Sequence, residues 1–203
     1  TDTWIATSTT NEPMGRFAHT AIWTGTEMIV WGGYYSDNTG GRYNPSTNSW
    51  IATSTGDYCP AARWGHTAIW TGSQMLIWGG YNMANYIYLN TGAKYIPASN
   101  RWETMSVVGT PLARREHASV WTGTELIIWG GIISSNAPYY TNTGGKYSPL
   151  SDVWTTIAVD DRLTARQIPS ALWTGTEAIF WGGYDGNYFN TGGRYNPVTN
   201  TWK

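Results

Sequence analysis

Charged side chains, cysteine and long apolar runs are all scarce in this sequence. Asp, Glu, Lys and Arg make up 12% of the residues, about half of the roughly 25% usual in soluble domains. The formal net charge is -1 and no cluster of Lys and Arg occurs, so nucleic acid is not expected as a partner. The only cysteine, Cys59, cannot form an intrachain disulfide, and no Cys/His set has the spacing of zinc ligands. No apolar run reaches the roughly 18 residues of a membrane-spanning helix, so we expect no membrane insertion.

One pattern recurs four times and explains most of the unusual composition. Its first copy begins at His19, passes Trp23 and the glycine pair Gly32-Gly33, and ends at Trp50. The tryptophans at the Trp23 position have spacings of 47, 51 and 52 residues: Trp23, Trp70, Trp121 and Trp173. A period of about 50 residues indicates a repeat architecture in which each unit buries a face against its neighbour. We therefore expect a single domain rather than two.

Each copy divides into four short extended segments, at 19–23, 27–31, 39–43 and 49–52 in the first copy. β-Branched and aromatic residues alternate with small ones there, and turn residues interrupt them at regular intervals. Thr24-Gly25 joins the first two segments, and the double glycine ends the second, where the backbone needs positive φ or a close approach to a neighbour. The pattern predicts four antiparallel strands per copy, which is typical of a propeller blade, and indicates no helix.

A double glycine, then a Tyr, then a Trp after six intervening residues, resembles the signature of the kelch repeat. Four pairs keep this spacing: Tyr43/Trp50, Tyr95/Trp102, Tyr147/Trp154 and Tyr195/Trp202. The resemblance covers essentially the whole chain. The chain is similar to the bacterial version of the repeat, which contains W-T-G-T-E and N-T-G-G-R-Y. It implies an all-β, kelch-type β-propeller with four four-stranded antiparallel blades in this chain. We place the blades at 16–53, 63–105, 114–157 and 166–203, and interpret the repeat tryptophans as blade-to-blade packing.

The fourth strand has one surplus copy, because Trp4 repeats the position of Trp50 and Trp202. In kelch propellers a terminal strand commonly completes the blade at the opposite terminus and removes exposed edges. We therefore expect residues 1–7 to act as a closing outer strand. Four large sheets around one axis is a strained arrangement, so three forms stay open: a closed four-blade ring, a self-associated pair with eight blades, or part of a longer chain.

The three histidines fall at one repeat position, which holds Pro169 in the fourth copy: His19, His66 and His117. A three-histidine metal ring is one interpretation, since propellers can carry axial metals. Packing is the other, because side chains of the innermost strand mostly point into neighbouring blades, where a neutral imidazole satisfies buried backbone groups. We expect packing, with no metal site and no cofactor.

Two sets of loops vary between copies: those joining the second and third strands, and those joining blades. In a four-stranded antiparallel blade both sets emerge on one face, and loops on a rigid scaffold usually carry binding residues. Tyr and Asn are abundant there and suit peptides and sugars alike. The candidate ligand-binding residues are Tyr34, Tyr35, Tyr81, Tyr86, Tyr88, Tyr139, Tyr140, Tyr184 and Tyr188.

These features favour a non-enzymatic recognition or scaffold propeller that binds a peptide, protein or glycan on the variable face. An enzyme acting on a glycan or peptide is the alternative, with acids such as Asp160, Asp161 and Asp185 as candidates. A purely structural, self-assembling propeller is the third interpretation. The low charge and the high Thr, Asn and Trp content lead us to expect an extracellular or cell-envelope location.

Overall fold

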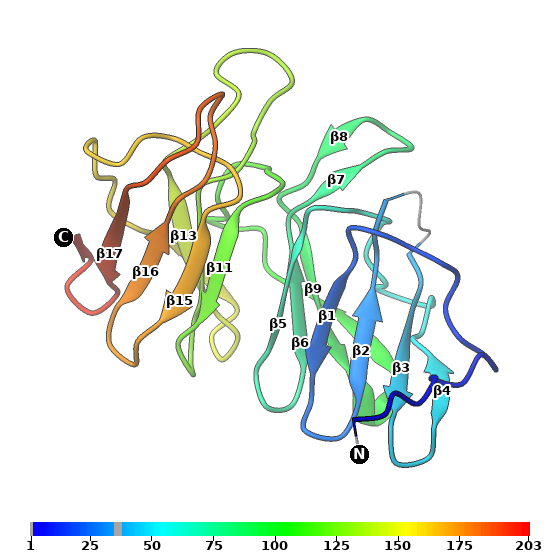
Figure 1. Cartoon of the computed structure of the whole chain (residues 1–203). Helices are drawn as coiled ribbons and strands as arrows, with labels where there is room; N and C mark the ends of the chain where they lie inside the picture. The colour runs from blue at the N-terminus through cyan, green and yellow to red at the C-terminus, as the bar shows by residue number, and fades with distance from the viewer. Residues whose placement is uncertain (1, 35–37) are drawn as a thin grey trace.

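The computed structural model describes residues 2–34 and 38–203, and their regular structure is almost entirely β (Figure 1). Blade 1 contains β1 (Thr20–Trp23), β2 (Met28–Trp31), β3 (Gly40–Asn44) and β4 (Ser49–Ala52). Blade 2 contains β5 (Thr67–Trp70), β6 (Met75–Trp78), β9 (Gly92–Ile96) and β10 (Arg101–Thr104). Blade 3 contains β11 (Ala118–Trp121), β12 (Leu126–Trp129), β13 (Gly144–Ser148) and β14 (Val153–Thr156). Blade 4 contains β15 (Ser170–Trp173), β16 (Ala178–Trp181), β17 (Gly192–Asn196) and β18 (Thr201–Trp202).

Each blade is a four-stranded antiparallel sheet whose strands lie side by side in chain order. A small hairpin of β7 (Tyr81–Asn82) and β8 (Ile87–Tyr88) stands between β6 and β9. The 3-10 turn η1 (Pro97–Ser99) joins β9 to β10. The expectation of an all-β chain built from four-stranded antiparallel sheets is confirmed for the residues that the structure describes.

The turns form where the sequence places its turn residues. In the β1–β2 turn the Thr24 hydroxyl oxygen accepts a hydrogen bond from the Glu27 amide at 2.9 Å, and Gly25 has a φ of +104°. In the β3–β4 turn Asn48 adopts a left-handed φ of 48°, which Asn tolerates better than most residues. These turns set the register that brings Tyr43 opposite Trp50, a pair repeated in the other three blades.

The four blades stand in an open series. The innermost strands β1, β5, β11 and β15 lie one against the next, whereas β15 and β1 form no close pair among the described residues. Figure 1 shows blades 3 and 4 on one side and blades 1 and 2 on the other. No closed ring is therefore present in the described part of this chain.

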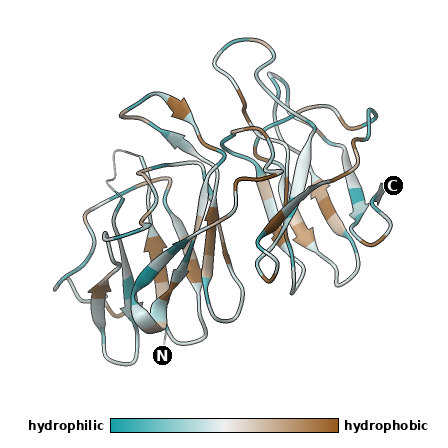
Figure 2. Ribbon diagram, turned by 180° about the vertical axis from the view of Figure 1, so that it is seen from behind, coloured by the Kyte–Doolittle hydropathy of each residue, from teal (hydrophilic) through white to brown (hydrophobic). Residues whose placement is uncertain are grey.

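The core lies between the blades rather than at one centre. One apolar cluster fills each of the three interfaces, and each contains a tryptophan from the second strand of one blade and one from the fourth strand of the next. Trp31 packs on Trp102, Trp78 on Trp154, and Trp129 on Trp202, with ring centroids 5.4, 5.1 and 5.7 Å apart. Figure 2 shows that apolar segments follow the strands while turns are mostly polar. The prediction of blade-to-blade packing is confirmed for these tryptophans.

The segment expected to close the propeller is placed differently. Residues 2–7 form no strand, and the Trp4 side chain is 97% exposed. The outer edge of β17 is already paired with β18 of the same blade. Residue 1 lies outside the described part of the chain.

Candidate functional site

The variable loops gather at one edge of the blades. The β7–β8 hairpin and the loop between β12 and β13 rise from this edge, opposite to the β5–β6 and β15–β16 turns (Figure 1). We call it the loop edge. Of the predicted tyrosines, Tyr86, Tyr139 and Tyr188 are exposed there, and five are half-buried: Tyr34, Tyr81, Tyr88, Tyr140 and Tyr184. Tyr35 lies outside the described residues.

An aromatic chain crosses from blade 1 to blade 2 at the loop edge. The ring of Tyr34 lies 4.9 Å from that of Phe17 and 5.3 Å from that of Trp64. Trp64 in turn lies 6.1 Å from Tyr81, which contacts Tyr88 at 4.9 Å. Such edge-on and tilted contacts stabilise aromatic pairs beyond the area they bury. Three predicted tyrosines are thus brought together, although through a tryptophan that the prediction omitted.

Arg115 covers this aromatic chain. Its guanidinium carbon lies 4.3 Å from the centre of the Trp64 ring and 5.6 Å from that of Tyr81, a geometry that attracts a cation to the ring face. Arg115 also forms an ion pair of 3.1 Å with Glu116. Burial raises the pKa of the Glu116 carboxyl, and the Arg115 charge opposes that rise. The arrangement fixes a donor and an acceptor side by side on a rigid aromatic base.

Two buried polar atoms at this stack have no partner among the described residues. They are Nε of Arg115 and Nε1 of Trp64. Buried donors without a partner are rare in folded proteins and cost free energy until an acceptor reaches them. Both atoms are enclosed within the stack, so an acceptor reaches them only when neighbouring side chains move.

A pocket of about 500 Å³ opens beside Arg115. It is lined by Tyr88, Arg115, Glu116, Ile132, Ser134, Ser135, Tyr139, Tyr140 and Gln167. The Tyr88 hydroxyl lies 3.3 Å from the Ser135 hydroxyl, so blades 2 and 3 meet across the pocket. Its walls combine aromatic faces with hydroxyl, amide and charged groups, the mixture usual in ligand sites.

The backbone beneath the pocket is held by contacts between blades. Residues 18, 65, 116 and 168 occupy one repeat position and all have left-handed φ values: Ala18 (54°), Gly65 (63°), Glu116 (55°) and Ile168 (45°). The Glu116 amide donates to the Gly65 carbonyl at 2.7 Å, and the Ile168 amide donates to the Glu116 carbonyl at 2.8 Å. These bonds link blades 2, 3 and 4 below the site and keep Arg115 and Glu116 in place.

The remaining predicted tyrosines lie apart from the stack. Tyr184 and Tyr188 pair with each other at 5.0 Å in blade 4, while Tyr86 occupies the tip of the β7–β8 hairpin. Sequence reasoning missed Phe17, Trp64, Arg115, Glu116 and Gln167. A signal was available, because position 64 holds one of two tryptophans outside the repeat, and its equivalents in the other copies are Phe, Arg and Gln.

The histidines do not form a metal ring. The rings of His66 and His117 pack edge-on against Trp31 and Trp78 of the preceding blade, at 5.4 and 5.2 Å. The Thr20 hydroxyl meets Nε2 of His66 at 2.8 Å. Within residues 2–34 and 38–203 no group of three or more His, Cys, Asp or Glu is arranged to hold a metal ion.

Two of the acids considered for catalysis, Asp160 and Asp185, form hydrogen bonds within their own loops. Arg162 binds both carboxylate oxygens of Asp160, and this hydrogen bonding lowers the pKa of the Asp160 carboxyl. A general acid needs the opposite shift. Asp185 accepts a hydrogen bond from the Asn187 amide at 3.1 Å, which shapes its own loop.

In the described part of the chain no helix is long and apolar enough to span a membrane.

Comparison with known proteins agrees with the repeat pattern. Residues 18–203 match a family model described as the KLHDC2/KLHL20/DRC7 Kelch-repeats domain. A search of curated proteins finds no match. The matched range contains all four blades, including the loop-edge residues from Ala18 onward.

Proposed function

Because this chain belongs to the kelch-repeat family, whose domains generally mediate protein–protein interaction, we propose that its loop edge binds a peptide segment of a partner protein. The observation that carries the proposal is the Trp64–Arg115 stack beside the pocket. It supplies a guanidinium group paired with a carboxylate on a preorganised aromatic base, and a preorganised site binds at a lower entropic cost.

The chemistry of the pocket favours a peptide over a sugar. Sugar rings need an open aromatic face, and the guanidinium of Arg115 covers the face of Trp64 at 4.3 Å. A peptide offers carbonyl oxygens to the guanidinium group of Arg115 and amide groups to the Glu116 carboxylate. Tyr139 and Tyr140 also line the pocket and supply flat surface with hydroxyl edges for the peptide side chains.

The test begins with selection of peptides from a displayed random library on the wild-type chain, followed by affinity measurement in solution. Arg115→Gln and Tyr139→Ala should each weaken a selected peptide by roughly tenfold or more, the loss expected when a central interface residue is truncated. Leu150→Ala is the matched control, because Leu150 is 98% exposed in the β13–β14 turn. Thermal unfolding of each variant checks that the fold is kept.

Two results would contradict the proposal. One is binding of the selected peptides that neither pocket variant changes. The other is a glycan array that yields ligands for the wild-type chain while the peptide library yields none, which would move the function to carbohydrate recognition.

A further inference from the structure

The three interfaces between blades share one set of contacts. The tryptophan that ends the second strand, at positions 31, 78 and 129, inserts into the next blade and is at most 2% exposed. The glycine pair follows it, and its second amide donates to an arginine carbonyl of the next blade: Gly33 to Arg63, Gly80 to Arg114 and Gly131 to Arg166, at 3.0, 2.7 and 2.8 Å. Each blade thus has a forward face, which carries the inserting tryptophan and the glycine pair. Its other side is a receiving face, which the forward face of the preceding blade covers.

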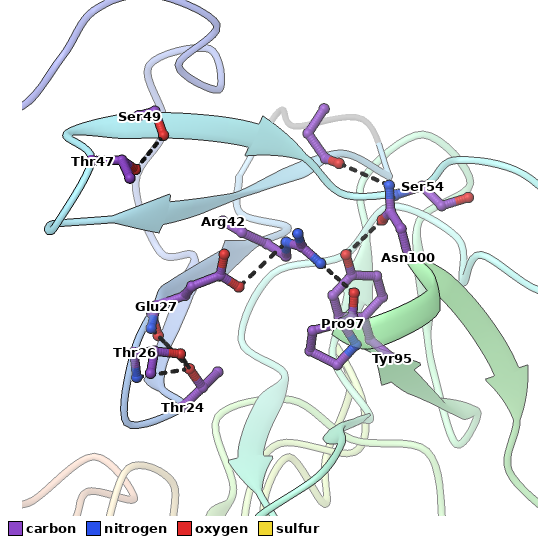
Figure 3. A network of polar contacts seen from close by, with 11 residues as sticks. Thr24, Thr26, Glu27, Arg42, Thr47, Ser49, Ser54, Tyr95, Pro97 and Asn100 are labelled. Carbon is purple, nitrogen blue, oxygen red and sulfur yellow. Dashed lines mark hydrogen bonds and ion pairs between the residues drawn. The ribbon is translucent and has the colours of Figure 1, made fainter.

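A basic residue in the third strand adds a polar contact to two of these interfaces. Arg42 of blade 1 donates to the Pro97 carbonyl of blade 2 while Glu27 balances its charge, as Figure 3 shows. Lys146 of blade 3 donates to the Pro197 carbonyl of blade 4 at 3.2 Å. The acceptor is in each case the proline of the turn between the third and fourth strands.

Among the described residues, no other blade covers the forward face of blade 4. Trp181 occupies the position of Trp31, Trp78 and Trp129, yet it is 55% exposed, and Leu172 beside it is 65% exposed. The side chain of Arg194, the equivalent of Arg42, is 54% exposed. A Cβ added to Gly182 would meet only the Phe189 carbonyl, at 3.7 Å, whereas one added to Gly32 or Gly79 would clash with a histidine of the next blade.

Blade 1 presents the receiving face, which no other blade of the described chain covers, although Nε1 of Trp50 donates to the Ser8 carbonyl at 3.0 Å. Trp50 and Tyr43 are half-buried, whereas their equivalents Trp102 and Tyr95 in blade 2 are almost fully buried. His19 is exposed, while His66 at the same position in blade 2 is 7% exposed. Both halves of one further interface therefore exist in this chain, at opposite ends of the open series.

We propose that a second copy of this chain covers both faces, with blade 4 of each copy docked onto blade 1 of the other. Trp181 would insert beside His19 and Trp50 of the partner copy, as Trp31 does beside His66 and Trp102. Arg194 would donate to the Pro45 carbonyl, and the Gly183 amide to the Arg16 carbonyl. This inference is independent of the peptide proposal, because it concerns the blade faces and not the loop edge.

The chemistry of the faces identifies the occupant. The forward face repeats the contacts that already bury three receiving faces of the same sequence, so a copy of the chain is complementary to it at every position named. The contact is head-to-tail, and two copies satisfy both faces of both chains in a closed ring. One chain alone leaves them bare, since β1 and β15 form no close pair among the described residues.

Residues 4–7 must move to allow this arrangement. Residues 4–8 and 50–54 share the sequence Trp-Ile-Ala-Thr-Ser. The Ser8 amide donates to Asn48 at 2.7 Å, as the Ser54 amide donates to Asn100 at 2.9 Å. Residues 4–7 therefore lie where β18 of the docked copy would end, and the exposed Trp4 would move aside.

The test is the molar mass by light scattering coupled to size exclusion, from micromolar to millimolar concentration. We expect the wild-type chain to reach, and stay at, twice its single-chain mass of 22.5 kDa. Trp181→Asp should raise the dissociation constant by roughly thirtyfold or more, as for a central aromatic residue of an interface. Leu150→Asp should leave the dimer intact, because Leu150 is 98% exposed in the β13–β14 turn. Deletion of residues 1–5 should keep or strengthen the dimer.

A mixing experiment tests the head-to-tail geometry. His19→Trp should block the receiving face, because this repeat position has little free space. At the interface between blades 1 and 2, a Cβ added to Gly32 would lie only 2.8 Å from the imidazole of His66, the equivalent of His19. His19→Trp alone and Trp181→Asp alone should each be monomeric. A mixture of the two variants should form a heterodimer through the one pair of faces that neither substitution alters.

Three results would overturn the proposal. They are a single-chain mass at every concentration, a mass that rises without limit, and a dimer that Trp181→Asp leaves unchanged. Near-ultraviolet circular dichroism checks that each variant is folded, and Arg194→Glu provides a second forward-face variant if Trp181→Asp fails to fold.

Discussion

At the scale of single residues, four arginines occupy one repeat position and hold backbone carbonyls. The guanidinium of Arg114 is fully buried and donates to the carbonyl oxygens of Gly130 and Thr143, at 2.9 and 2.7 Å. Burial lowers the pKa of Arg114 to about 10, so the side chain still carries its charge at neutral pH. Each such arginine closes the gap that the double glycine leaves between the second and third strands.

Replacement of Arg114 should therefore be costly. Arg114→Met leaves several buried carbonyl oxygens without a donor, and we expect a loss of about 3 kcal/mol in the free energy of unfolding. Arg16→Met is the matched control, because Arg16 makes the same bonds to Gly32 and Thr39 but is partly exposed, so water can replace it. Urea unfolding measures both. Equal losses would show that burial does not govern the role of these arginines.

The histidines make the stability of the fold depend on pH. Burial, followed by repulsion from Arg63, lowers the pKa of His66 to about 3, and burial also lowers that of His117. Below about pH 6.5 the unfolded chain binds a proton that the folded chain rejects, so stability falls as the pH drops from 6.5 towards 3.

From pH 7 to pH 5 we expect His66 alone to cost about 2 kcal/mol of unfolding free energy. His66→Gln should remove that part of the dependence, because glutamine does not titrate. Urea unfolding at the two pH values measures the slope. A variant with the wild-type slope would show that His66 is not the titrating group.

At the scale of elements, strands and turns follow local sequence, whereas the candidate site does not. The β1–β2 turn forms at Thr24-Gly25 because local hydrogen bonds and a positive φ specify it. The Trp64–Arg115 stack joins residues of different blades, and neither residue carries a local pattern that indicates the other. Repeat comparison therefore located the loop edge but not its central pair. Residues 2–7 form no strand, and β18 of the same chain pairs with the outer edge of β17.

The glycine pair shows how closely neighbouring blades approach. Gly79 and Gly182 have nearly the same φ, 72° and 73°, so alanine is equally strained at both. A Cβ on Gly79 would also lie 2.7 Å from His117, whereas one on Gly182 has open space towards the missing neighbour. In the Trp181→Asp background we expect Gly79→Ala to cost roughly 2 kcal/mol more than Gly182→Ala. Equal costs in thermal or urea unfolding would contradict the close approach of the blades.

At the scale of the whole molecule, stability comes from a series of equivalent interfaces. Each blade buries its second-strand tryptophan in the next blade, so the chain gains three interfaces and leaves two faces bare. In such a series the terms between neighbours add, and an end blade has one term fewer than an inner blade. In Trp181→Asp, where both end faces stay bare, blades 1 and 4 should therefore open before blades 2 and 3, and hydrogen exchange should be fastest in β1 to β4 and β15 to β18.

Two uncovered faces also make the unfolding temperature depend on protein concentration. If a second copy covers the bare faces, it binds only the folded chain, and mass action raises the unfolding temperature as the protein concentration increases. Trp181→Asp removes the insertion of Trp181 without touching an interior interface, so its unfolding temperature should depend much less on concentration than that of the wild type. Differential scanning calorimetry across two decades of concentration measures this. A wild-type unfolding temperature that does not change would mean that the end blades stay uncovered, and that the three interior interfaces alone stabilise the fold.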